Sequence, residues 1–121
     1  MKEIISLIKK YGDDYLVCDG NIPLLSNGSF IEELLLYGIS TDKISIICDI
    51  FYQITGKEIG RASILTNLSG GQRIILMTIF ALNSPADKIL LNNVFHFIDD
   101  DKIDRLNKLI EQHPEKIVLI I

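Results

Sequence analysis

The chain has 121 residues, of which 48% are hydrophobic and 23% charged, and this length and composition predict one folded domain rather than a disordered chain. A net charge of -4 provides no basic surface for nucleic acid, so no nucleic-acid partner is expected. The longest apolar run, residues 74–82, is about half the length needed to cross a bilayer, and the charged N-terminus is not typical of a signal peptide. We therefore expect a cytoplasmic protein, associated with a membrane only through a partner.

Three short segments are expected before residue 29. Apolar side chains at positions 4–8 predict a short helix, and the apolar run 15–18, bounded by aspartates, predicts a strand. Residues 21–28 contain a proline and an Asn-Gly pair, so they predict a loop.

Two helices and a connector are expected next. Ser29 stands three residues before Glu32, the spacing of a capping box, and predicts a helix whose paired Glu32 and Glu33 face solvent. Residues 41–55 have apolar side chains at the spacing of a helix with one buried face. Residues 57–67 mix glycine, serine and threonine with apolar residues and predict a connector of undefined shape.

The second half of the chain has a clearer pattern. Ser69 is expected to cap a helix over residues 70–83, whose apolar side chains form part of the core. A buried strand at 88–93, a helix at 100–112 and a second buried strand at 116–121 follow. Strand, helix and strand in this order, with apolar runs on both strands, predict a right-handed parallel crossover.

These elements predict a small α/β fold. Its sheet is expected to be largely parallel, with a mixed sheet as the alternative. The whole chain, 1–121, is expected to form a single domain, with a helical subdomain at about 29–83 and a sheet-containing part at 14–18 and 84–121. A sheet of only three strands has open edges with unpaired backbone groups. We therefore expect a second copy of the chain or another partner to cover an edge.

Four residues at the start of the helix 70–83 carry the clearest functional pattern. Gly70 and Gly71 leave backbone N–H groups uncovered in the first helical turn, where such donors have no partner within the helix. Ser69 adds a hydroxyl, and the helix dipole contributes about half a positive charge. With Gln72, these groups predict a small anion site suited to phosphate; an ordinary serine-capped helix is the alternative.

The residues around this turn resemble the signature region of ATP-binding-cassette (ABC) ATPases. The sequence Leu-Ser-Gly-Gly-Gln-Arg at 68–73, an apolar helix, Ser-Pro at 84–85, a buried strand and Ile-Asp at 98–99 follow one another as in that family. The resemblance implies that the strand is the Walker B strand and that Asp99 belongs to the D-loop at an interface. It is strongest over residues 65–121.

The chain also departs from the family at its catalytic positions. No Gly-x-x-x-x-Gly-Lys-Ser/Thr sequence occurs in the 121 residues, no glutamine lies between residues 19 and 25, and the switch histidine would follow after Ile121. Asn92 and Asn93 stand where the family has Asp-Glu; asparagine neither holds Mg²⁺ well nor acts as a base. We therefore assign no catalytic residue and no metal site, and expect no autonomous ATPase.

In the family, the signature of one subunit closes over ATP held by another. The resemblance thus implies that Ser69, Gly70, Gly71 and Gln72 act in trans on a partner ATPase, or that the chain regulates one. The chain alone is expected to bind no cofactor. ATP with magnesium is expected only at a composite site formed with a partner. The implied partners are another ABC-type ATPase subunit or a second copy of the chain, and through them a membrane permease. Two alternatives are a nucleotide-independent interaction module and a truncated ATP-binding subunit of an ABC transporter.

The remaining histidine, aspartate and cysteine residues have simpler interpretations. His96, between two phenylalanines, is expected to be exposed or at the rim of the core, with a partner-facing role as the alternative. The acidic run 99–101 is expected to stabilise a helix N-terminus rather than bind metal. Cys18 and Cys48 lie in apolar settings and are expected to be free thiols, since neither has a histidine at ligand spacing.

Overall fold

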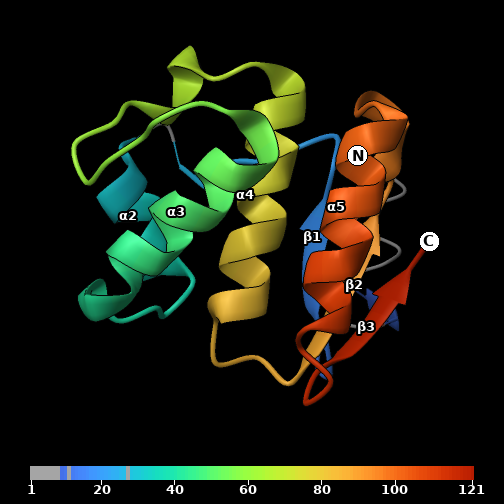
Figure 1. Ribbon diagram of the computed structural model, residues 1–121. Coiled ribbons are helices and arrows are strands. Elements are labelled where there is room, and N and C mark those ends of the chain that lie inside the picture. The colour runs from blue at the N-terminus through green and yellow to red at the C-terminus, as the bar shows by residue number, and fades with distance from the viewer. Residues whose placement is uncertain (1–8, 11, 27) are drawn as a thin grey trace.

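The structure, a computed structural model, describes residues 9–10, 12–26 and 28–121. The short helix expected at residues 4–8 lies outside them. Strands and helices alternate along the second half of the chain, whereas the first half contains one strand followed by two helices (Figure 1). In chain order, the elements are β1 (Leu16–Asp19), α2 (Phe30–Leu36), α3 (Ile44–Thr55), α4 (Gly70–Asn83), β2 (Lys88–Asn92), α5 (Asp100–Glu111) and β3 (Ile117–Ile120). Three single-turn 3-10 helices join them: η1 (Thr41–Lys43), η2 (Leu65–Asn67) and η3 (Phe95–Phe97).

The three strands form a parallel sheet in the order β1-β2-β3, which confirms the predicted α/β fold and its parallel crossover. Asp19, the last residue of β1, pairs in register with Asn92, the last residue of β2. The backbone N–H of Asn93 then donates to the carbonyl oxygen of Ile121 at 2.9 Å. The carboxyl ends of the three strands therefore meet at one end of the sheet.

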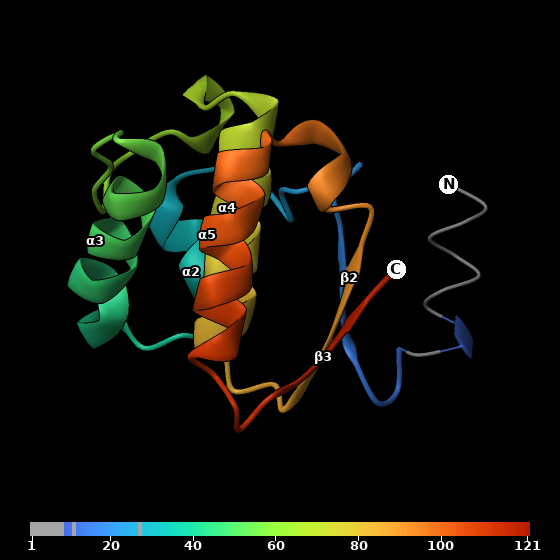
Figure 2. The same cartoon turned by 45° about the vertical axis from the view of Figure 1, so that its right-hand side comes forward.

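Helix α4 is the centre of the molecule. It lies between the sheet and α3, with α5 beside it, as Figure 2 shows. Every residue from Ile74 to Leu82 is buried, because the helix is covered on several sides. This explains why its apolar residues extend around the helix instead of forming a single stripe. No helix in the described part of the chain is long and apolar enough to span a membrane.

The capping box predicted at Ser29 is wrong. Ser29 does precede α2, but its side chain makes no capping hydrogen bond. Its backbone instead forms an antiparallel bridge with Ile64, and the N–H of Phe30 donates to the carbonyl oxygen of Ser63 at 2.9 Å. The connector 57–67 thus folds back onto the start of α2, a long-range contact that spacing within one helix could not indicate.

The prediction that Glu33 faces solvent is also wrong, since only 1% of this residue is exposed. Its carboxylate accepts hydrogen bonds from the backbone N–H groups of Leu25 and Ser26 at 3.1 and 2.6 Å, and from the Ser26 hydroxyl at 2.7 Å. Glu33 therefore fastens the loop that follows β1 to helix α2.

Candidate functional site

The turn at residues 69–72 has the expected helix start. Ser69 is the N-cap of α4, and its Oγ accepts a hydrogen bond from the backbone N–H of Gln72 at 3.1 Å. In return, Oε1 of Gln72 accepts from the backbone N–H of Ser69 at 3.0 Å, which completes a capping box. The Gln72 carboxamide is therefore engaged within the turn, while the Ser69 hydroxyl keeps its own proton to donate.

Two backbone donors of this turn remain available. Among the described residues, no acceptor receives the N–H groups of Gly70 and Gly71. Ser69 and Gly70 are exposed, whereas Gly71 and Gln72 are half-buried. These amides lie at the positive end of a 14-residue helix, so a phosphate oxygen fits their chemistry.

The two glycines have different structural roles. A Cβ atom added at Gly70 would meet nothing within 4 Å, so this position is open to an approaching molecule. At Gly71, the added atom would lie 3.3 Å from both Cγ2 of Ile98 and the carbonyl oxygen of Phe97. Glycine at 71 thus allows the segment after β2 to pack closely on the first turn of α4.

Two open hollows adjoin the turn. The first, about 490 Å³, lies against the loop after β1 and includes Asn21, Gly70 and Arg73 in its lining. The second, about 410 Å³, includes Ser69 and Asp99. Side chains from two further segments thus surround the predicted anion site.

Phe97 and Arg73 shape the space around the turn. Phe97 lines both hollows and is 54% exposed. Nη2 of Arg73 donates to the carbonyl oxygen of Thr66 at 2.6 Å, but its Nε is buried and has no partner among the described residues. Arg73 thus contributes a positive charge to the lining of the first hollow.

Asp99 lies close to the turn, and His96 lies three residues before Asp99 in the sequence. Asp99 is the N-cap of α5, where its carboxylate accepts from the backbone N–H of Lys102 at 3.0 Å and from the Lys102 ammonium at 2.9 Å. These hydrogen bonds lower the pKa of Asp99. His96 is exposed, with its ring edge-on to Phe97 at 4.8 Å between centroids. The expected D-loop residue therefore shares a hollow with the predicted signature.

Asn92 and Asn93 lie at the end of β2, where the resemblance places the Walker B residues. Asn92 is 4% exposed, and its Nδ2 donates to Oδ1 of Asp19 at 3.2 Å. Asn93 has a positive φ of 55°, a conformation that asparagine tolerates better than most residues, and its Nδ2 donates to Oδ1 of Asn21 at 3.0 Å. Both carboxamides are thus committed to hydrogen bonds within the protein.

Asp19 and Asn21 also lie at this end of the sheet, but they were not predicted as site residues from the sequence. Oδ1 of Asp19 also accepts from the backbone N–H and the Nδ2 of Asn21, both at 3.0 Å. Polar residues directly after an apolar strand could have indicated them, because the carboxyl ends of neighbouring parallel strands meet.

A magnesium ion does not fit this end of the sheet. The carboxylate of Asp19 at this end has Oδ1 occupied by three N–H donors, and its neighbours Asn21 and Asn92 are uncharged. No group of three or more His, Cys, Asp or Glu side chains is placed for a metal in the described residues. The turn at residues 69–72 and the end of β2 thus differ: the N–H donors of the first suit a phosphate, whereas the uncharged carboxamides at the second do not suit Mg²⁺.

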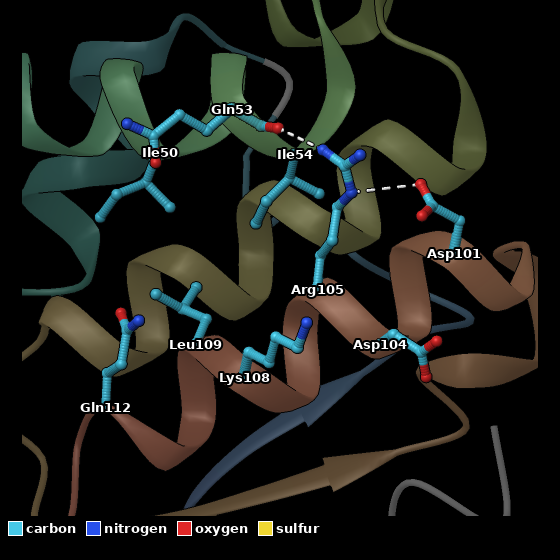
Figure 3. Close-up of a pocket in the computed structure, with 9 residues that line it drawn as sticks. All are labelled: Ile50, Gln53, Ile54, Asp101, Asp104, Arg105, Lys108, Leu109 and Gln112. Atoms are coloured by element: carbon cyan, nitrogen blue, oxygen red, sulfur yellow. Dashed lines mark hydrogen bonds and ion pairs between the residues drawn. The ribbon is translucent and has the colours of Figure 1, made fainter.

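A third hollow, of about 480 Å³, lies between α3 and α5 (Figure 3). Arg105 reaches across it, donating from Nη1 to the carbonyl oxygen of Gln53 at 2.7 Å and pairing through Nε with Asp101 at 3.1 Å. Arg105 therefore joins the C-terminal turn of α3 to α5. The Nη1 and Nε groups of Arg105 are engaged in these contacts.

Comparison with solved structures finds this fold in ATP-binding proteins of ABC transporters. A protein described as an ABC transporter ATP-binding protein from Pyrococcus furiosus matches with a TM-score of 0.68 and 22% identity, over 93% of this chain and 58% of its own. A protein described as a cobalt transport ATP-binding protein matches with a TM-score of 0.65 and 18% identity, over 87% and 41%. The chain thus has an ABC ATPase-like fold and spans about half the length of these proteins. No family model and no curated protein matches the sequence.

Proposed function

We propose that this chain completes a nucleotide-phosphate site on a partner ATPase of the same fold and does not hydrolyse ATP by itself. The observation that carries the proposal is the exposed turn at the start of α4, where the N–H groups of Gly70 and Gly71 have no acceptor among the described residues and Ser69 adds a hydroxyl. Donors at a helix N-terminus bind phosphate because their hydrogen bonds and the helix dipole act together.

Action on a partner is supported by the chemistry at the end of β2. Asn92 and Asn93 carry no charge, and both side chains already donate to neighbouring side chains. They neither hold Mg²⁺ nor accept a proton from an attacking water. The ATP and its magnesium would thus be held by the second molecule, an ABC-type ATP-binding protein, and a permease would be reached through that complex.

The substitution Ser69→Asp tests the phosphate contact without destroying the helix cap. Aspartate caps helices about as well as serine and is favoured by the dipole, but its charge repels a phosphate. We expect an ABC-type ATP-binding protein captured with the chain from native cells to hydrolyse ATP faster when wild-type chain is added. The Ser69→Asp chain should have the wild-type melting temperature and should still bind the partner. Its stimulation of the partner's ATP hydrolysis should be at least tenfold weaker.

Ser40→Asp is the matched control, because it adds the same charge on the exposed surface near the other end of α4, where Lys43 Nζ donates to the carbonyl oxygen of Asn83. It should stimulate like the wild type. Full stimulation by the Ser69→Asp chain contradicts the proposal. Micromolar binding of magnesium-ATP by the isolated chain in calorimetry does so as well.

A second candidate is an interaction module without a nucleotide role. The capping box favours it, since Ser69 and Gln72 satisfy each other without any ligand. Under this function, the Ser69→Asp chain binds and affects its partner as the wild type does. A third candidate, an ATP-binding subunit of an ABC transporter, is supported by the fold likeness and opposed by Asn92 and Asn93. ATP hydrolysis by the protein purified from its native cell would favour it.

A further inference from the structure

The end of the sheet that carries Asn92 contains one buried carboxylate, that of Asp19, which is 8% exposed. Asp19 and Asn92 are register partners on neighbouring parallel strands, so their side chains leave the sheet next to each other. None of the ion pairs among the described residues involves Asp19. Its charge is instead balanced by N–H donors, including Nδ2 of Asn92 at 3.2 Å.

A carboxylate at position 92 would create a different site. Two carboxylates on paired strands at this separation repel each other, unless a proton or a cation lies between them. The amide of Asn92 removes that repulsion by replacing one acceptor with a donor. The carboxamide of Asn92 therefore stabilises the Asp19 carboxylate, as a divalent cation would stabilise a pair of aspartates at these positions.

Further hydrogen bonds at this end of the sheet connect two loops. The N–H of Gly20 donates to the carbonyl oxygen of Asn92 at 2.8 Å, and Nδ2 of Asn93 donates to Oδ1 of Asn21 at 3.0 Å. The loop after β1 is thus joined to the turn after β2 by both backbone and side-chain hydrogen bonds. We call the four side chains of Asp19, Asn21, Asn92 and Asn93 the end clasp.

We propose that the end clasp is a metal-independent lock, in which the amide of Asn92 takes the place of a divalent cation beside Asp19. The clasp holds the loop after β1 against the end of β2 whether or not magnesium or nucleotide is present. It goes beyond the proposed function, because it needs neither ATP nor a partner. Asp19 is a positioning residue here, acting through Asn21 and Asn92.

The test compares melting temperatures in EDTA and in millimolar Mn²⁺ or Mg²⁺. The wild type should melt at the same temperature in both. Asn92→Asp should melt about 5 °C or more lower in EDTA, because of the paired carboxylates, and should recover with Mn²⁺. The exchange variant Asp19→Asn/Asn92→Asp restores one carboxylate and one carboxamide. Its melting temperature should therefore be close to that of the wild type and should not change when metal is added.

Mn²⁺ binding followed by electron paramagnetic resonance gives a second readout. The Asn92→Asp chain should bind Mn²⁺, and the wild type should not. The proposal is overturned if Mn²⁺ raises the melting temperature of the wild type, or if Asn92→Asp is as stable as the wild type in EDTA. If Asn92→Asp does not fold without metal but the exchange variant does, the expected repulsion is confirmed. If neither variant folds, the proposal is overturned.

Hydrogen exchange of the backbone amide of Asn21 tests the lock itself. This N–H donates to Asp19, so its protection reports whether the loop stays fastened. We expect the same exchange rate in the wild type with and without magnesium-ATP. A rate that changes more than about threefold on adding magnesium-ATP contradicts a metal-independent clasp.

Discussion

The buried carboxylate of Glu33 accepts two hydrogen bonds from Ser26, one from its backbone N–H at 2.6 Å and one from its hydroxyl at 2.7 Å. Ser26 belongs to the loop that begins after β1, and Asn21 of this loop lines the same hollow as Gly70 and Gly71. Helix α2 and the end clasp therefore hold the two ends of the same loop. A buried carboxylate accepts hydrogen bonds from the loop at each end, Asp19 at the first and Glu33 at the second.

Glu33→Gln should destabilise the protein by about 1–3 kcal/mol, because its NH₂ group replaces one of the two acceptor oxygens that face N–H and O–H donors. Urea unfolding gives the change in the free energy of unfolding. Glu32→Gln is the control, since the exposed neighbour should change stability by no more than about 0.5 kcal/mol. Equal effects of the two substitutions would show that the buried contacts of Glu33 contribute nothing.

Gly20→Ala should also destabilise the protein. A Cβ atom at Gly20 would lie 2.3 Å from the carbonyl oxygen and 2.9 Å from the carbonyl carbon of Asn93, and both are backbone atoms that cannot rotate away. Separating the two segments should cost about 1–3 kcal/mol. At Gly60, the added atom meets nothing within 4 Å, so Gly60→Ala should leave the urea midpoint unchanged or raise it slightly. A Gly20→Ala chain as stable as the Gly60→Ala chain contradicts this contact.

The elements that could be predicted from the sequence are those determined by contacts along the chain. Helix α4 begins and ends at the predicted residues, because Ser69 caps it and Ser84-Pro85 follows it. The bounds of β2 and β3 were predicted within about two residues, because each strand is a continuous apolar run. The burial predicted for β3 is wrong: none of its residues is buried, and Ile117 at its start is 55% exposed, because β3 is an edge strand of the sheet. The hydroxyl and glycines of the predicted anion site follow from the same local pattern.

The parts that were missed depend on contacts between distant residues. The burial of Glu33 requires the loop at residues 25–26 to fold back on α2, and the bridge at Ser29 requires the connector around Ile64. Asp19 and Asn92 are 73 residues apart, and only the sheet register brings them together. Helical or strand periodicity contains no information on these pairings.

The two thiols should differ in reactivity. Cys18 is 3% exposed, and burial raises its pKa to about 12, so its reactive thiolate is scarce in the folded protein. Cys48 is half-buried, and burial raises its pKa too, but it can be reached from solvent. At about pH 8, Ellman's reagent should modify one thiol readily in the folded wild type and the second only in denaturant. The Cys48→Ser chain should lose the faster reaction; rapid modification of that variant contradicts the burial of Cys18.

The carboxylate of Asp99 should make stability fall in acid. Hydrogen bonds from the Lys102 ammonium and backbone N–H lower its pKa in the folded protein below its ordinary value of 3.8, which applies to the unfolded chain. A group with a lowered folded pKa stabilises the protein fully above the unfolded pKa, and this contribution is lost as the pH falls through the folded pKa. We therefore expect Asp99 to contribute above about pH 4 and progressively less below it. Because the Asp99 side chain is exposed, solvent keeps the effect small.

The substitution Asp99→Asn keeps the cap of α5, since asparagine is as good an N-cap as aspartate, but the new carboxamide cannot be protonated in this range. Urea midpoints measured at about pH 7 and pH 3 should therefore fall less in Asp99→Asn than in the wild type. Asp104→Asn removes an exposed aspartate in the middle of the same helix and should retain the wild-type difference between the two pH values. If Asp99→Asn loses as much stability in acid as the wild type, the hydrogen bonds from Lys102 do not stabilise the N-terminus of α5.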